Sequence, residues 1–265
     1  MAKSFKGKIV VITGATAGIG LAAAAMFEER GAHVICVARH ESDRFESVCA
    51  DISDGEQVKR TAERIIAKHG GIDILVNNAG GGISGTIEDS DPEDVKRLFD
   101  VNFFGALNFI REVLPSMRER GGGTIINVSS VAAQLAIPFQ SFYSASKAAL
   151  SSLSSALRNE VAPFNIKVCA LLPGDVKTQF TSSRKKSLST NPAYGDRAGR
   201  AVATMERDEQ GGMPPEVVAR AICRLASSQH PPVYSVVGAK YKLFVALSKI
   251  LPSRPVNFIL GKLYG

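Results

Sequence analysis

The sequence contains no apolar run that approaches the roughly 18–20 residues of a membrane-spanning helix. Its first residues, MAKSFKGKIVVITG, also lack the apolar core and small-residue end of a secretory signal peptide. We therefore expect a cytoplasmic protein whose contact with membranes, where it occurs, is peripheral.

Cysteine and histidine are scarce, with four residues of each, and neither type is clustered along the chain. The cysteines are Cys36, Cys49, Cys169 and Cys223, and the histidines are His33, His40, His69 and His230. Because the C-x-x-C spacing of zinc and redox sites is missing, we expect the cysteines to be buried free thiols. The sequence predicts no metal site.

Acidic residues are missing after Glu216, and this accounts for the net charge of +7. The last 49 residues hold 7 of the 32 basic residues, which leaves 25 basic against 25 acidic residues before them. These basic residues alternate with Phe, Leu, Ile and Val, whereas a nucleic-acid-binding surface gathers them on one face. We expect no nucleic-acid partner.

Short apolar runs alternate with helical patterns along most of the chain. Strands are expected at residues 8–14, 32–38, 72–78, 123–130, 166–172 and 232–238, and a brief apolar step lies at 47–50. Helices are expected at 17–31 and 54–69, from Asp91 onward, and around Tyr143. A strand, a helix and a second strand within some 30 residues require a parallel sheet with right-handed crossovers. The pattern predicts one α/β domain with a doubly wound sheet of about seven strands and helices on both faces.

The first strand is followed by TGATAGIG, which places Gly14, Gly18 and Gly20 at the mouth of the first helix. Glycines at this point permit a tight turn and allow backbone N–H groups to approach a pyrophosphate. Close packing of helix on strand explains one such glycine but not all three. The turn therefore predicts a nucleotide site.

Tyr143 and Lys147 lie four residues apart in SFYSASKAAL, so a helix would place them on one face. An ammonium near a phenol favours the phenolate and would lower the tyrosine pKa from its usual value of about 10. Such a tyrosine is a general acid and base. An ordinary amphipathic pair is the alternative that these residues alone leave open.

Together these motifs resemble the short-chain dehydrogenase/reductase family, over residues 8 to about 180. The resemblance rests on the TGATAGIG turn, the NNAG of Asn77–Gly80, Ser130 thirteen residues before Tyr143, the YSASK motif and Pro173-Gly174. It implies a single Rossmann-like domain that moves hydride between a nicotinamide nucleotide and an alcohol or ketone. It also implies a homodimer or homotetramer.

The resemblance assigns catalytic roles to four residues. Tyr143 is expected to exchange a proton with the substrate oxygen, to which Ser130 donates a hydrogen bond. Lys147 lowers the pKa of Tyr143 and holds the nicotinamide ribose. Asn102 holds a water that leads from Lys147 to solvent, and it is also a polar residue at which a helix would kink.

The resemblance also implies a set of cofactor-binding residues. They are Gly14, Thr16, Gly18, Ile19, Gly20, Arg39, Asp51, Ile52, Asn78, Ala79, Gly80, Tyr143, Lys147, Pro173, Gly174, Val176 and Thr178. Arg39 follows the second strand, where an arginine accepts the 2′-phosphate of NADP and an acidic residue would bind the ribose of NAD. We therefore expect NADP(H), with His40 or Arg44 assisting. Only eleven residues separate Arg39 from Asp51, too few for a full helix.

Two segments differ from the regular pattern within the single domain 1–265. Residues 178–212 are polar with weak apolar periodicity and are expected to form a substrate lid, with a tolerated surface insertion as the alternative. Residues 239–265 form an apolar and basic extension. We expect this extension to close the substrate pocket, to pack on a partner subunit or to lie on a membrane surface. Of these, we expect burial against protein ahead of membrane contact.

The extension resembles that of the family branch acting on hydroxysteroids and related lipids. It implies a small hydrophobic substrate, a hydroxysteroid or bile acid. The alternative within the enzyme class is an acyl-dihydroxyacetone-phosphate or other acyl-chain ketone reductase, with Arg184, Lys185 and Lys186 binding an anionic group. The alternative of another class is a nucleotide-sensing protein without turnover.

Overall fold

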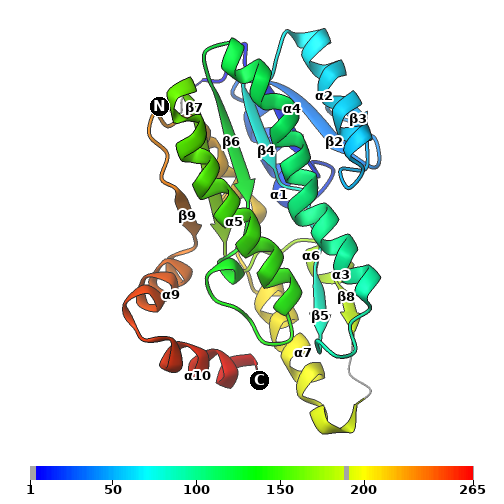
Figure 1. Ribbon diagram of the computed structural model, residues 1–265, viewed down its shortest axis with the longest axis vertical. Coiled ribbons are helices and arrows are strands. Elements are labelled where there is room, and N and C mark those ends of the chain that lie inside the picture. Colours follow the sequence, from blue (N-terminus) through cyan, green and yellow to red (C-terminus); the bar gives the residue numbers. More distant parts are fainter. Residues whose placement is uncertain (1–3, 188–190, 265) are drawn as a thin grey trace.

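The computed structural model describes residues 4–187 and 191–264 and contains a parallel sheet of seven strands (Figure 1). The strands are β1 (Ile9–Thr13), β2 (His33–Ala38), β3 (Glu46–Cys49), β4 (Ile74–Asn77), β6 (Gly123–Val128), β7 (Ile166–Pro173) and β9 (Tyr234–Val237). Their order is β3-β2-β1-β4-β6-β7-β9, so the chain changes direction across the sheet between β1 and β4. The expected α/β sheet is confirmed, and its switch point is where such folds bind ligands.

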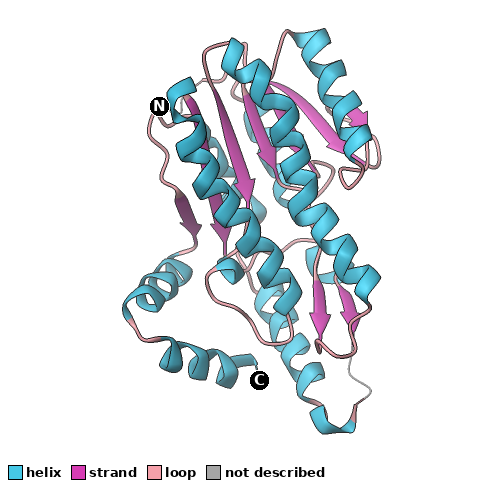
Figure 2. Ribbon diagram, in the orientation of Figure 1, coloured by secondary structure: helices cyan, strands magenta, loops and turns pink. Residues whose placement is uncertain are grey.

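Helices cover both faces of the sheet, as Figure 2 shows. α1 (Gly18–Glu28) and α8 (Pro215–Ala226) pack on one face, and α2 (Gly55–His69), α4 (Ala106–Glu119) and α5 (Ser141–Val161) pack on the other. Along β1, Val10 joins the first core and Val11 the second, and both side chains are fully buried. Burial on both faces explains why the strands read as continuous apolar runs.

The long helix expected from Asp91 is divided into three parts. The Asp91 side chain caps α3 (Pro92–Phe99) by accepting a hydrogen bond from the backbone N–H of Glu93. A π-helical segment, Asp100–Gly105, then joins α3 to α4. π-Helical turns are rare and often occur at functional sites. Asn102 lies within this one, at the irregularity that its polar side chain suggested.

The connection from β2 to β3 has only the seven residues 39–45 and contains no helix, in agreement with the short spacing. β3 therefore pairs with the second half of β2, with Glu46 opposite Ile35. Arg39 and His40 are exposed on this connection. The expectation that all four cysteines are buried is wrong for Cys49, which is exposed because β3 is an edge strand.

Two of the histidines that are scattered in the sequence meet in the structure. His33 and His69 each place Nε2 against the Glu46 carboxylate, at 2.7 Å and 3.1 Å. Among the described residues these three form a group of metal-ligand types. Lys68 Nζ also lies 2.8 Å from the Glu46 carboxylate, so the negative charge already has a basic partner.

Residues 178–212 contain more regular structure than their composition predicts. α6 (Phe180–Ser183) is followed by β8 (Lys185–Ser187), which pairs with β5 (Ile83–Gly85) in a second, two-stranded sheet. α7 (Arg197–Gln210) then returns toward the core. The expectation of an irregular stretch is wrong for α7. The buried face of α7 includes small side chains such as Ala198 and Ala201. Because alanine is only weakly apolar, the helical periodicity of this segment is hard to recognise in the sequence.

The chain ends in two helices, α9 (Ala239–Ile250) and α10 (Ser253–Tyr264). They lie at the end of the molecule toward which the strands of the large sheet point (Figure 1). Within the described parts of the chain, no helix combines the length and the apolar character needed to cross a membrane.

A buried polar chain fixes α5 on the sheet. Asn77 Nδ2 donates to Asn127 Oδ1, and Asn127 Nδ2 donates to the Ser154 hydroxyl on α5, each at 2.8 Å. Asn127→Ala would leave both partners buried without it, so we expect the free energy of unfolding to fall by about 2–3 kcal/mol. Urea denaturation measures this loss. The control Asn257→Ala, at an exposed position on α10, should change stability by less than about 0.5 kcal/mol. An equally small change for Asn127→Ala would contradict the role of the chain.

Candidate active site

A cavity of about 880 Å³ lies at the carboxyl ends of β1, β4 and β6. The expected site residues that line it are Gly14, Thr16, Gly18, Ile19, Arg39, Asp51, Ile52, Asn78, Ala79, Gly80, Ser130, Tyr143, Lys147, Pro173, Gly174, Val176 and Thr178. Gly20 and Asn102 are buried behind the wall. The structure therefore brings together residues that are up to 164 positions apart in the sequence, Gly14 and Thr178.

The glycine turn after β1 forms one end of the cavity. Gly14 and Gly18 have φ angles of +67° and +54°, in the left-handed region that favours glycine. A Cβ on Gly20 would lie 2.3 Å from the Gly14 carbonyl oxygen, so only glycine fits there. The turn directs the amino end of α1 toward the cavity, which is the arrangement that binds pyrophosphate.

The ends of β1 and β4 are joined by side chains beneath this turn. The Thr13 hydroxyl accepts hydrogen bonds from the backbone N–H groups of Asn78 and Ala79, both at 3.0 Å. Asn78 Nδ2 in turn donates to the Gly14 carbonyl at 3.1 Å. The NNAG segment thus holds the nucleotide turn in place from the neighbouring strand. Thr13 was not among the expected site residues, although it opens the TGATAGIG motif.

Asn102 connects the loop after β4 to α5. Its Oδ1 accepts a hydrogen bond from Gly81 N at 2.8 Å, while its Nδ2 donates to Gly81 O at 3.1 Å and to the Ser146 hydroxyl at 3.0 Å. A Cβ on Gly80 would lie 3.0 Å from Asn102 Oδ1 and 3.2 Å from Lys147 Nζ. Both donated bonds of the Asn102 amide therefore go to protein atoms, and the expected binding of a water by this residue stays a prediction.

Tyr143 and Lys147 share one face of α5, as their spacing predicts. Lys147 is 4% exposed and donates from Nζ to the Val128 carbonyl at 2.9 Å. Its Nζ lies 5.9 Å from the centroid of the Tyr143 ring. The ammonium is thus held at the end of β6, on the cavity wall beside the tyrosine.

The expected lowering of the Tyr143 pKa is not found in this structure. Burial raises the pKa of Tyr143 to about 12, and a hydrogen bond with the Ser130 side chain opposes the rise. Burial also lowers the pKa of Lys147 to about 8. The ammonium is directed at the Val128 carbonyl rather than at the phenol oxygen, which explains why desolvation outweighs its attraction. Tyr143 therefore carries its proton at neutral pH.

Three residues beside Tyr143 were not expected from the sequence. The ring of Phe180 on α6 lies 5.4 Å from the ring of Tyr143, measured between centroids. The carboxylates of Asp175 and Glu209 both contribute to the raised pKa of Tyr143. All three line the cavity. No short motif marks them, because two belong to the polar segment 178–212 and the third immediately follows Pro173-Gly174.

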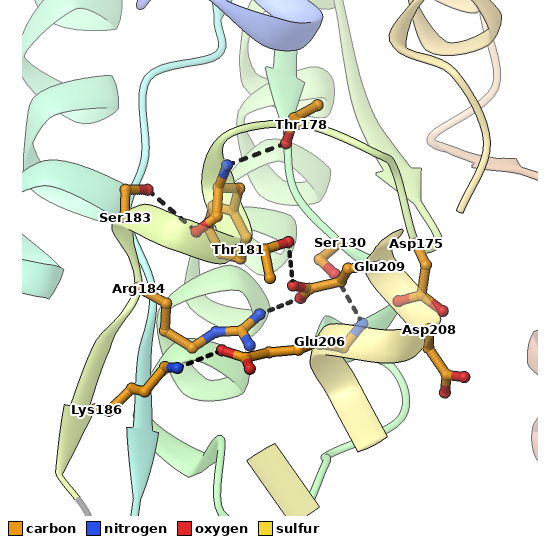
Figure 3. A network of polar contacts seen from close by, with 12 residues as sticks. Ser130, Asp175, Thr178, Thr181, Ser183, Arg184, Lys186, Glu206, Asp208 and Glu209 are labelled. Carbon is orange, nitrogen blue, oxygen red and sulfur yellow. Dashed lines mark hydrogen bonds and ion pairs between the residues drawn. The ribbon is translucent and has the colours of Figure 1, made fainter. Parts of the chain in front are cut away.

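The basic residues Arg184, Lys185 and Lys186 are already paired with acids. Figure 3 shows Arg184 directed at Glu209, which also accepts a hydrogen bond from Thr181, and Lys186 directed at Glu206. Lys185 pairs with Asp94. The Arg184 side chain is fully buried. These three residues therefore hold the segment on the domain, and their expected binding of an anionic substrate group is not supported.

Arg39 follows β2 and lines the cavity. Its charge adds to the lowering of the pKa of Asp51, which is caused first by a hydrogen bond from Ser53. Arg44 instead pairs with Glu28 at 2.6 Å and does not line the cavity, whereas His40 does. The glycine turn and the exposed Arg39 beyond the end of β2 thus line the same cavity.

Comparisons with known proteins agree with this geometry. A model of the family described as short chain dehydrogenase matches residues 8–189. A 3-ketodihydrosphingosine reductase of Bacteroides thetaiotaomicron is 38% identical over 97% of this chain and 98% of its own length. The dehydrogenase/reductase SDR family member 7B of Xenopus laevis is 34% identical over 92% of this chain and 78% of its own.

Solved structures give the same result. A short-chain dehydrogenase from Streptomyces avermitilis is 34% identical, with a TM-score of 0.83 and coverage of 92% of this chain and 93% of that one. A 3-ketoacyl-(acyl-carrier-protein) reductase from Brucella melitensis, solved in complex with NADH, is 30% identical with a TM-score of 0.73. It covers 88% of this chain and 96% of its own.

The burial of Lys147 makes a prediction about stability. Its pKa falls from 10.5 when exposed to about 8 in the folded protein, so the unfolded state binds the proton more tightly. The cost of folding is fully present below pH 8 and disappears as the pH rises through 10.5. Lys147→Met removes this cost but also loses the hydrogen bond to Val128. We therefore expect it to raise the free energy of unfolding at pH 7 by about 2 kcal/mol, and by less at pH 10.

Urea denaturation at several pH values measures this effect. The control Lys59→Met, at an exposed position on α2, should have little effect at any pH. A Lys147→Met protein that is less stable than the parent at pH 7 would show that burial of the ammonium is not penalised.

Proposed function

This chain belongs to the short-chain dehydrogenase/reductase family, and on that premise we propose that it is an NADP(H)-dependent reductase of ketones on long-chain lipids. Family membership makes it an oxidoreductase that uses a nicotinamide cofactor on CH–OH or ketone groups. The observation that carries the proposal is the arrangement of Ser130, Tyr143 and Lys147 on the wall of one cavity with the glycine turn.

The residues of this chain supply the proton and the orientation of the substrate. When bound, the nicotinamide cofactor supplies the hydride. The Ser130 hydroxyl orients the carbonyl oxygen, and Tyr143 gives that oxygen its proton. A phenol with a pKa of about 12 carries its proton at neutral pH, so Tyr143 can donate it to the carbonyl oxygen of a ketone. Lys147 would hold the nicotinamide ribose beside it.

The lipid class of the substrate rests on a relative and on the paired charges. The similar protein from Bacteroides thetaiotaomicron is named for a keto lipid, 3-ketodihydrosphingosine. Arg184 pairs with Glu209 and Lys186 with Glu206, and neither basic residue lines the cavity. Lys185 does line it and is paired with Asp94. The cavity therefore has fewer basic residues for an anion than expected, which disfavours the phosphate of an acyl-dihydroxyacetone phosphate and the carboxylate of a bile acid. The similarity to a protein named for a keto lipid therefore favours a long-chain ketone without an anionic head over the steroid as the proposed substrate.

Three further features stay proposals. Arg39 favours NADP(H) over NAD(H), because it is exposed at the cavity end where the 2′-phosphate of NADP would lie. A homodimer or homotetramer and a cytoplasmic location are expected from the family resemblance and from the sequence. A nucleotide-sensing protein without turnover is the alternative of another class, and any cofactor oxidation that depends on a ketone excludes it.

The substrate proposal is tested by the absorbance of NADPH with a panel of ketones. We expect the highest kcat/KM for 3-ketodihydrosphingosine, a lower value for a steroid ketone and the lowest for acyl-dihydroxyacetone phosphate. A preference for the phosphate ester would contradict the proposed substrate. The absence of turnover with every ketone would favour the sensing protein.

Tyr143→Phe should lower kcat by at least about a hundredfold, because a positioned proton donor contributes about 10²–10⁴-fold. NADPH binding, followed by fluorescence titration, should change by less than about twofold, since the ring remains in place. Tyr194→Phe is the matched control, because Tyr194 does not line the cavity. A Tyr143→Phe enzyme that retains a tenth of the kcat would exclude Tyr143 as the proton donor.

Arg39→Asp should raise the KM for NADPH by at least about tenfold while leaving or lowering the KM for NADH. The added carboxylate repels a 2′-phosphate and accepts a hydrogen bond from a 2′-hydroxyl. Arg44→Asp controls for charge, because Arg44 lies outside the cavity in an ion pair with Glu28. Equal effects of Arg39→Asp on both cofactors would show that Arg39 does not distinguish them.

A further inference from the structure

The two terminal helices expose an unusual number of large apolar side chains. Twelve such side chains are exposed in the described parts of the chain, and eight of them belong to residues 243–263. Ile250 is 81% exposed, Phe258 66% and Leu263 54%. The others are Leu243, Phe244, Leu247, Leu251 and Ile259. We call these eight the apolar face of α9 and α10, and include Leu251 from the link between the two helices. A surface of this kind marks an interaction site.

The exposure does not result from helices that fail to pack on the domain. Val245 of α9 is 5% exposed and belongs to a small core with Val131 and Leu172. The Tyr241 hydroxyl donates to the Asp175 carboxylate, and the Tyr264 hydroxyl donates to Asp208 on α7. One side of each helix is therefore fixed on the protein, and the apolar face is what the other side presents outward.

The same helices carry charge of one sign only. They contain five basic residues, Lys240, Lys242, Lys249, Arg254 and Lys262, and no acidic residue. Lys242, Lys249 and Arg254 are exposed beside the apolar face. Exposed apolar side chains with interspersed cations complement the surface of a bilayer that contains anionic lipids.

We propose that the apolar face of α9 and α10 binds the surface of an anionic membrane. Each helix has 12 residues, which is too short to span a bilayer but suits a helix that lies in its interface. A second copy of the chain is the competing occupant. In a symmetric dimer the same surface meets itself, so the five basic residues of each copy would meet without one acidic partner on these helices.

The membrane-binding helices adjoin the substrate cavity. A Cβ on Gly174 would lie 2.0 Å from Tyr241 Cδ2, so α9 packs directly against a residue of the cavity wall. Asp175, the partner of the Tyr241 hydroxyl, also lines the cavity. Docking by these helices places the cavity next to the bilayer, from which a lipid substrate would enter; this last step alone rests on the proposed function.

The absence of tryptophan from the chain permits a direct test. Phe258→Trp introduces a single indole on the apolar face. Its emission should shift to shorter wavelength when vesicles of phosphatidylcholine and phosphatidylglycerol are added, and the shift should decrease in 1 M salt, where charge attraction is screened. Phe164→Trp is the control, since Phe164 is 41% exposed but lies on another part of the surface, and its emission should not change.

Flotation with the same vesicles tests the charge complementarity without any measurement of turnover. Lys249→Gln with Arg254→Gln should weaken binding about thirtyfold, because each basic side chain near an anionic surface contributes about 1 kcal/mol. Lys59→Gln with Arg64→Gln removes the same charge from exposed positions on α2 and should leave binding nearly unchanged.

Two results would overturn the proposal. One is a Phe258→Trp emission that does not respond to vesicles. The other is an emission that shifts with protein concentration alone, together with a larger mass in sedimentation that Ile250→Ser with Phe258→Ser abolishes. That result would assign the face to a second copy of the chain. Neither result depends on the identity of the substrate, so the proposed reductase activity would still stand.

Discussion

The attachment of α5 to the carboxyl half of β6 is the constraint on which the site depends. Four polar contacts contribute to it: Asn127 with Ser154, Ser129 with the carbonyl of Lys147 and with the Ser151 hydroxyl, and Lys147 with the carbonyl of Val128. All of them are buried, where a hydrogen bond is costly to leave unmade. They fix both the rotation and the height of the helix. Tyr143 reaches the cavity because these contacts hold α5 in place at Lys147, four residues after it.

The parts of the molecule that local pattern determines are those that the sequence predicts. All six strands placed from the sequence are present, and the apolar step at residues 47–50 overlaps a seventh, β3. Gly14, Tyr143 and Lys147 line one cavity. Buried parallel strands and a helix with a four-residue repeat leave a mark on consecutive residues. The ends of parallel strands must meet at one edge, so motifs placed at those ends come together without knowledge of side-chain contacts.

The parts that depend on partners distant in sequence were not predicted. Arg184 is neutralised by Glu209, 25 residues away, and Lys185 by Asp94. The run of three basic residues therefore suggested an anion site, whereas in the structure these residues form ion pairs within the protein. The direction of the Tyr143 pKa shift likewise depends on burial, which is a property of the packed structure. Sequence spacing places the ammonium near the phenol but does not say which atom it faces.

The contact of Tyr241 with the Gly174–Asp175 segment couples the apolar face of α9 and α10 to the wall of the cavity. The tyrosine belongs to the helices that carry the apolar face, and the segment belongs to the cavity wall. A ligand that displaces the wall must therefore change the position of α9, and with it the free energy of any contact made by that helix. Coupling of this kind is reciprocal. If a partner of α9 changes the affinity of the cavity for its ligand by some factor, the ligand changes the affinity of α9 for that partner by the same factor.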